Sequence, residues 1–132
     1  GVSGANRTGR PFTGDYAGDL LFATLLKFGY ATGTYAASID DGVKLVDCRI
    51  SNAVRCVPPE NKPTPEEALT CRTHLGATLD APFAHAAEHA LPKGVTLIDS
   101  YHCSRYNTNT RRLTTEMFEN VFDQARRITA KA

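Results

Sequence analysis

The first fifteen residues combine a glycine-rich backbone with side chains that can hold a planar, polarised ligand. Residues 1–15 include four glycines, and Phe12 is the only aromatic residue among them. Glycine allows close backbone approach, and N–H groups that lead into a helix start can hold an anion or an electron-rich oxygen. We therefore expect Phe12 to form the floor under a planar group and Asp15 to lie at a helix start. A surface loop with an N-cap Asp is an equally good interpretation of this run alone.

Two further polar side chains lie at the ends of predicted strands. Asn52 falls near the end of a partly alternating strand over residues 44–53, and His102 follows the clearest strand, residues 94–101. Open α/β sheets place their ligands at strand ends. An Asn that satisfies a local turn and a His bonded to backbone remain the alternatives.

The stretch after His102 is polar, basic and aromatic, as in nucleic-acid-binding loops. Because the net charge is only +1, any contact with DNA has to come from such a local patch. A solvated charged face is the alternative. The candidate DNA-binding residues are Ser104, Arg105, Asn107, Arg111 and Arg112.

The four cysteines form no C-x-x-C pair, so a self-contained zinc site is not indicated. Without a secretory signal they favour a reducing compartment, and we expect a cytoplasmic, prokaryotic protein. Cys48 and Cys103 are expected to be reduced, mostly buried thiols. Cys56 opens a proline-rich loop, and Cys71 lies about two turns inside the predicted helix that begins at residue 64. His85 and His89 are four residues apart and could share a helix face, but no third metal ligand is adjacent, which favours a solvated or packing pair over a metal site.

The elements that position these residues alternate between helix, strand and loop. Leucines at helical spacing predict a helix over residues 16–28, capped by Asp15 and ended by Gly29. A loop over residues 30–42 follows. Thr114 caps a final helix with an apolar side. This order predicts an α/β fold with a parallel sheet, and 132 residues suffice for one domain. No apolar run approaches the length of a membrane span.

Three stretches resemble uracil-DNA glycosylases of the iron–sulfur type, closest to the family 5 branch. Residues 4–15 resemble the first active-site motif of that branch, residues 52–71 its cluster segment, and residues 101–114 its His-containing DNA loop. The three stretches cover most of the chain and occur in the same order. The resemblance implies a three-layer α/β/α sandwich around a short parallel sheet.

The resemblance also implies an activity: hydrolysis of the N-glycosidic bond of uracil flipped out of single- or double-stranded DNA, by a monomer. Phe12 would stack on the base, Asn52 and His102 would bind its polar edge, and Asp15 would lie under the sugar. Gly1 and Val2 would complete the substrate-binding loop. The five residues of the basic stretch would contact DNA, with Arg105 entering the space that the flipped nucleotide leaves.

The same resemblance implies a cofactor and reveals departures. Cys56 and Cys71 would ligate a 4Fe–4S cluster, with two further cysteines outside this chain. Many relatives read His-Pro-Ser where this chain has His102, Cys103 and Ser104. The family's opening strand and a segment near residues 79–82 are missing, so we expect one domain over residues 1–132, incomplete at the N-terminus and near residues 79–82.

Two other functions remain open at this point. One is a non-catalytic nucleic-acid-binding module that uses Arg105, Tyr106, Arg111 and Arg112. The other is an iron–sulfur or zinc protein with a structural or redox role. Release of uracil from DNA, which leaves an alkali-labile abasic site, separates a glycosylase from both. Relatives of this branch resemble broad-range enzymes, so other deaminated bases are further candidate substrates.

Overall fold

The fold is taken from a computed structural model, which describes residues 9–50, 65–66 and 82–130. The chain divides into two compact units, Gly1–Arg49 with Phe83–Ala132, and Ile50–Pro82. Nearly all described residues belong to the first unit. In the second unit Pro65 and Glu66 are helical and exposed, at the predicted start of the helix after the proline-rich loop. The single domain over residues 1–132 stays a prediction.

Helix α2 (Tyr16–Lys27) confirms the predicted helix together with its cap. The Asp15 backbone is extended, and its Oδ1 accepts a hydrogen bond of 2.9 Å from the Gly18 N–H. That bond satisfies one of the donors left without a partner at a helix start. The helix ends at Phe28, and Gly29 follows with φ 81°. Its buried side includes Ala17, Phe22 and Leu25.

Strands β1 (Ala31–Thr32) and β2 (Lys44–Leu45) form a short antiparallel pair. The predicted strand over residues 44–53 is wrong in length over its described part, because only β2 is strand there. Asp47 has φ 52°, a left-handed conformation that cannot continue an extended strand. The chain nevertheless stays beside β1, since the Cys48 Sγ donates to the Tyr30 carbonyl at 3.3 Å. The predicted loop over residues 30–42 contains β1.

Strands β3 (Glu88–Leu91) and β4 (Val95–Ile98) form an antiparallel hairpin with Leu91 opposite Val95. The turn η3 (Pro92–Gly94) joins them. Such a short connection permits only antiparallel pairing, because parallel strands need a long crossover. The predicted strand over residues 94–101 is confirmed only over β4, because residues 99–101 are not strand. The predicted parallel sheet is wrong for the described residues, where both sheets are antiparallel. The suggested helix face of His85 and His89 is also wrong, since His89 lies in β3.

Two helices follow β4. Helix α4 (Arg105–Asn109) begins at Ser104, whose Oγ accepts from the Asn107 N–H at 3.2 Å. The stretch interpreted from the sequence as a nucleic-acid loop therefore contains one helical turn. Helix α5 (Thr115–Ala130) has the predicted cap, because the Thr114 Oγ1 accepts from the Met117 N–H at 3.1 Å.

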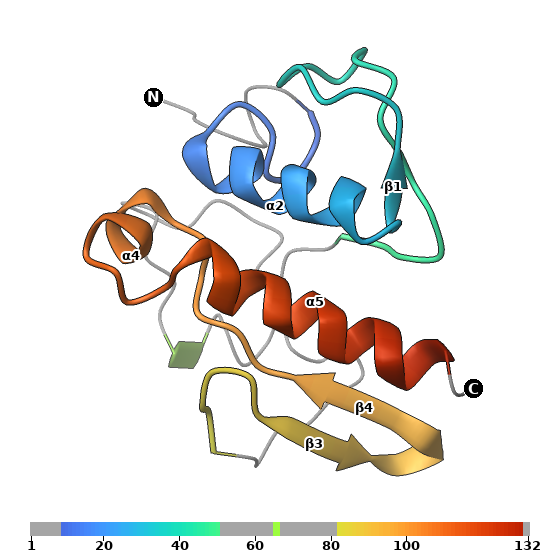
Figure 1. The fold of residues 1–132 in the computed structure, drawn as a ribbon, viewed down its shortest axis with the longest axis vertical. Helices are drawn as coiled ribbons and strands as arrows, with labels where there is room; N and C mark the ends of the chain where they lie inside the picture. The colour runs from blue at the N-terminus through green and yellow to red at the C-terminus, as the bar shows by residue number, and fades with distance from the viewer. Residues whose placement is uncertain (1–8, 51–64, 67–81, 131–132) are drawn as a thin grey trace. The chain divides into compact units, whose positions relative to one another are not determined.

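Helix α5 lies between α2 and the β3–β4 hairpin (Figure 1). On one side the Phe28 and Phe122 rings are 6.3 Å apart. On the other side the Gln124 amide donates to the Ala86 carbonyl at 3.1 Å. The core cluster comprises Ala17, Cys103, Leu113 and Phe118. Within the described ranges, no helix combines the length and apolar character of a membrane span.

Candidate active site

Phe12 occupies a strained backbone position at the start of α2. Its φ is 56°, which is unusual for a bulky side chain. The Phe12 carbonyl approaches the first turn of α2 so closely that a Cβ on Gly18 would lie 1.7 Å from its oxygen. Only glycine permits this approach. A residue in such a conformation persists only where the surrounding structure holds it, and residues of this kind are enriched at functional sites.

An ion pair anchors the loop that precedes Phe12. The Arg10 guanidinium binds the Asp41 carboxylate through two bonds of 2.9 and 2.8 Å, and its Nε donates to the buried Thr13 Oγ1 at 2.7 Å. Asp41 also accepts from the Ala36 and Val43 N–H groups. Paired, planar contacts of this kind are strong and specific in geometry. They fix the loop on the segment that leads to β2.

The same ion pair gives a prediction on stability. Hydrogen bonding to Arg10 holds the pKa of the Asp41 carboxyl well below its usual range. Asp41→Asn should therefore lower the thermal unfolding midpoint by several degrees at pH 7. Because the folded pKa is depressed, this stabilisation is present above the unfolded value of about 3.9 and is lost as the pH falls below it. The difference between wild type and variant should shrink toward pH 3 in scanning calorimetry.

The adjacent exposed Asp40 provides the matched control for this experiment, because its side chain makes no ion pair within the described residues. Asp40→Asn should leave the midpoint within about a degree of wild type. Equal midpoints for the Asp41 variant and wild type at pH 7 would contradict the anchoring role.

Asp15 combines a helix cap with an exposed charge. Its Oδ1 is occupied by the Gly18 N–H. Its second oxygen makes no hydrogen bond to the part of the chain that the structure describes, and the residue is solvent-exposed. The carboxylate is therefore available to a positive charge or to a water molecule outside the protein surface. Both interpretations made from the sequence, a cap and a site residue, are compatible with this geometry.

The tertiary structure places His102 beside Phe12. Their ring centroids are 5.8 Å apart with a 32° angle between the planes. His102 is exposed, and its ring makes no hydrogen bond to the described residues. Its backbone carbonyl accepts from the Asn107 Nδ2 at 2.9 Å. The imidazole is thus open to a ligand while its main chain is held.

Cys103 fastens the His102 turn to α2. The side chain is buried, and its Sγ donates to the Ala17 carbonyl at 3.4 Å. Burial raises the pKa of the Cys103 thiol to about 11, and the nearby negative charge of Asp15 contributes in the same direction. The thiol therefore stays protonated at neutral pH. The predicted burial of Cys103 is confirmed, whereas Cys48 is only partly buried.

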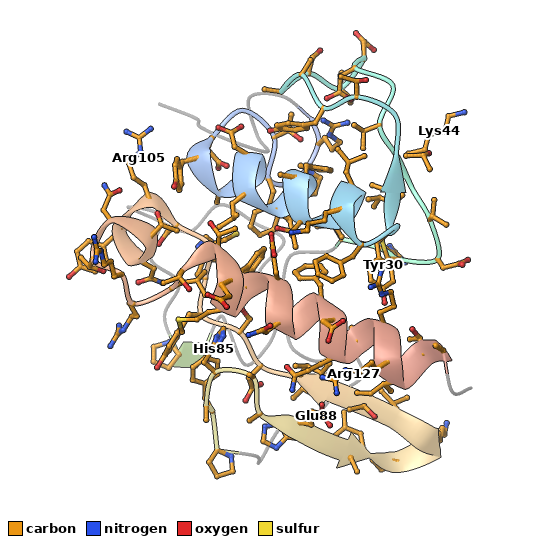
Figure 2. The ribbon with its side chains drawn as sticks, viewed as in Figure 1. Tyr30, Lys44, His85, Glu88, Arg105 and Arg127 are labelled. Carbon is orange, nitrogen blue, oxygen red and sulfur yellow. The ribbon has the colours of Figure 1, made fainter. Side chains whose placement is uncertain are left out.

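Two of the candidate DNA-binding arginines, Arg105 and Arg112, lie over aromatic rings of the same unit. The Arg105 guanidinium lies 5.5 Å from the ring centre of Tyr16, the first residue of α2 (Figure 2). Arg112 lies 5.4 Å from the Tyr101 ring centre. Arg111 is exposed, with φ 59° just beyond α4. Arg105 therefore reaches from α4 to Tyr16 at the start of α2.

Five residues named from the sequence lie outside the described ranges, so the structure does not test them. They are Gly1, Val2, Asn52, Cys56 and Cys71. Among the residues that are described, no group of three or more His, Cys, Asp or Glu side chains is arranged to hold a metal ion. The candidate site residues within the described ranges are Phe12 and His102, whose rings are in contact, together with Asp15 and Arg105.

Sequence reasoning missed three residues that support this site. Arg10 lies in the glycine-rich run and Asp41 in the predicted loop over residues 30–42, and the sequence pattern assigns no role to either side chain. His85 packs against the Tyr101 ring, in agreement with the packing alternative, but the sequence does not indicate this partner. A histidine on a short segment before a strand carries no sequence signal for such a contact.

Comparison with known proteins agrees with the geometry. The model of the uracil DNA glycosylase superfamily matches residues 1–126. A type-5 uracil-DNA glycosylase of Thermus thermophilus is 39% identical over 97% of this chain and 71% of its own length. The chain belongs to the uracil DNA glycosylase superfamily, within its type-5 group. Type-5 enzymes of Mycobacterium bovis and Pyrobaculum aerophilum are 35% and 36% identical, over 95% and 92% of this chain.

The chain spans only part of these relatives. It covers 58% of the Mycobacterium bovis protein and 65% of the Pyrobaculum aerophilum protein. The Thermus alignment extends over 157 residues, although this chain has 132, so that relative has residues inside the matched region without a counterpart here. The alignment length does not place them, and a missing segment near residues 79–82 stays a prediction.

Proposed function

We propose that this protein is a DNA glycosylase that releases uracil by hydrolysis of the N-glycosidic bond. The observation that carries the proposal is the contact between the Phe12 and His102 rings, together with the exposed Asp15 carboxylate three residues after Phe12. These are an aromatic face, a carboxylate and an imidazole. The named relatives are uracil-DNA glycosylases, which supports the same assignment.

The chemistry requires stabilisation of two developing charges. As the bond between the sugar C1′ and the base nitrogen breaks, its electron pair leaves with the base, and the sugar becomes an oxocarbenium-like cation. Asp15 stabilises that cation and orients the water that adds to C1′. His102 donates a hydrogen bond to the base oxygen on which negative charge collects. Fixed groups directed at developing charge supply large rate effects.

Phe12 and Asn52 serve recognition in this proposal. The base has to leave the helix stack to reach the site. Phe12 stacks on the flipped base, and its fixed backbone avoids an ordering cost on binding. Asn52 supplies a donor and an acceptor to the imide edge of the pyrimidine. Gly1 and Val2 are assigned to the same substrate-binding loop.

The test of the function is a glycosylase assay on an oligonucleotide with one uracil. The expected product is an abasic site, seen as strand cleavage after alkali, with free uracil released in equal amount. A protein that shifts the oligonucleotide in a binding assay but leaves it intact would be a binding module instead. The same assay with hypoxanthine or xanthine in place of uracil defines the range of bases.

DNA binding is assigned to Ser104, Arg105, Asn107, Arg111 and Arg112. The Ser104 Oγ already accepts a hydrogen bond as the cap of α4, and the Asn107 Nδ2 already donates to the His102 carbonyl. Their contacts with phosphate are therefore proposed through the remaining donor groups. The arginines supply the charge that sets affinity and its salt dependence.

Arg105 is proposed to enter the space left by the flipped nucleotide. Arg105→Ala should slow release of paired uracil about tenfold more than release of uracil in a single strand, because opening the duplex costs a few kcal/mol. Arg111→Ala is the matched control: it should weaken both substrates about equally and reduce the salt slope by roughly one unit. An unchanged duplex-to-single-strand ratio in the Arg105 variant would refute the wedge. Single-turnover rates on the two substrates give the comparison.

A 4Fe–4S cluster on Cys56 and Cys71 is part of the proposal, with two further thiolates from outside this chain. The two described cysteines are otherwise engaged, since Cys48 and Cys103 each donate to a backbone carbonyl. Thiolates are the usual ligands of such clusters, and the role would be structural. The broad visible absorbance of protein purified without air is the measurement for this cofactor.

A further inference from the structure

His85 joins the His102 segment to the start of α5 through three contacts. Its Nδ1 accepts a hydrogen bond of 3.1 Å from the Tyr101 N–H. Its Nε2 lies 3.2 Å from the Met117 carbonyl oxygen. The imidazole also stacks on the Tyr101 ring, with centroids 5.1 Å apart and 17° between the planes. Figure 2 shows His85 next to the first turn of α5.

These contacts define one form of the imidazole. Because Nδ1 accepts from a backbone N–H, the ring proton has to lie on Nε2, from which it is donated to the Met117 carbonyl. The neutral ring with its proton on Nε2 satisfies both bonds at once. A side chain at position 85 therefore has to supply one hydrogen-bond acceptor, in place of Nδ1, and one donor, in place of Nε2.

The main chain at His102 is consequently held from two directions. His85 binds the N–H of the preceding residue, Tyr101, and Asn107 donates to the His102 carbonyl at 2.9 Å. The His102 ring makes no hydrogen bond of its own to the described residues. Its direction is thus set by this backbone and by its contact with Phe12.

We propose that His85 is a positioning residue for base release: it holds the Tyr101 amide so that the His102 imidazole faces the bound base. The inference rests on the proposed glycosylase function. A displacement of about 1 Å in a group that acts on the reacting atoms can cost 10²-fold in rate. Substitution of His85 should therefore lower the rate of base release and leave the DNA affinity unchanged.

Two isosteric variants separate the bonds of His85. Asparagine places its amide oxygen where Nδ1 lies, so His85→Asn keeps the acceptor for the Tyr101 N–H. Glutamine places its amide nitrogen near Nε2, so His85→Gln keeps the donor to the Met117 carbonyl and loses the acceptor. In single-turnover assays on single-stranded uracil DNA, the Gln variant should be roughly 10- to 100-fold slower than wild type. The Asn variant should stay within a few-fold of wild type.

DNA affinity and the unfolding midpoint should be similar for the two variants, which excludes a general loss of folding. Equal rates for both variants and wild type would overturn the proposal, and so would equal losses in both.

Nitrogen NMR shifts of the His102 ring test the positioning role of His85 without catalysis. They should change in His85→Gln and remain in His85→Asn. Unchanged His102 shifts in both variants would overturn the role of His85, whereas wild-type protein without base release would refute only the proposed function.

Discussion

Asp15→Asn should lower the single-turnover rate of uracil release by about 10²- to 10³-fold, with little change in DNA affinity. Asparagine is as good an N-cap as aspartate, so the bond from the Gly18 N–H and the start of α2 should be preserved. Only the negative charge is lost. Removal of one group that stabilises developing charge typically has an effect of this size.

The design separates catalysis from folding. Asp19→Asn removes the same charge from an exposed position in the first turn of α2 and should leave the rate within about threefold of wild type. Asp15→Ala should in addition lose about 1 kcal/mol of stability, because the cap disappears. A rate for Asp15→Asn close to that of wild type would remove the carboxylate from the mechanism and leave it as a cap alone.

His102→Phe is expected to slow uracil release by about 10²- to 10³-fold as well. Phenylalanine keeps an aromatic ring against Phe12 but carries no hydrogen-bond donor. The variant therefore isolates the hydrogen bond to the leaving base from the packing of the two rings. Single-turnover kinetics at saturating protein, with DNA affinity measured by fluorescence anisotropy, give the two quantities.

The substrate provides an independent check on the role of His102. A base with an electron-withdrawing substituent, such as 5-fluorouracil, carries negative charge more easily and depends less on an external donor. The loss of rate in His102→Phe should therefore be smaller for 5-fluorouracil than for uracil. The same loss with both bases would mean that His102 does not stabilise the leaving group.

Comparison of the Asp15 and His102 variants shows whether the two residues act on different parts of the substrate. If Asp15 acts on the sugar and His102 on the base, the 5-fluorouracil effect should be confined to the His102 variant. Because both groups act in one transition state, the double variant should lose less than the sum of the two free-energy effects. Full additivity would indicate that the two residues act independently.

Local signals in the sequence determined the helices of this protein. The cap and the leucine spacing identified α2, and Thr114 with its apolar positions identified α5. These features act over three or four residues, so neighbouring residues are sufficient to predict them. The resemblance to family 5 is equally a property of short motifs, and it is confirmed by the superfamily match together with the similarity to type-5 relatives.

The strands were harder to predict because single residues outside their pattern decide where they end. The alternation of polar and apolar residues predicted a strand up to residue 53, but the left-handed backbone of Asp47 ends the extended segment after β2. The turn of η3 folds β4 back on β3, and so makes the described sheet antiparallel. Neither effect changes the hydrophobic pattern from which strands are predicted.

Only the tertiary structure decided how the site is assembled. It turned Phe12 toward His102 through a strained backbone, paired Arg10 with Asp41, and set His85 against Tyr101. These contacts join segments that are far apart along the chain. Their geometry depends on the packing of α2 and α5 around a common core. Contacts between distant segments produce no periodic pattern in the sequence, so periodicity cannot predict them.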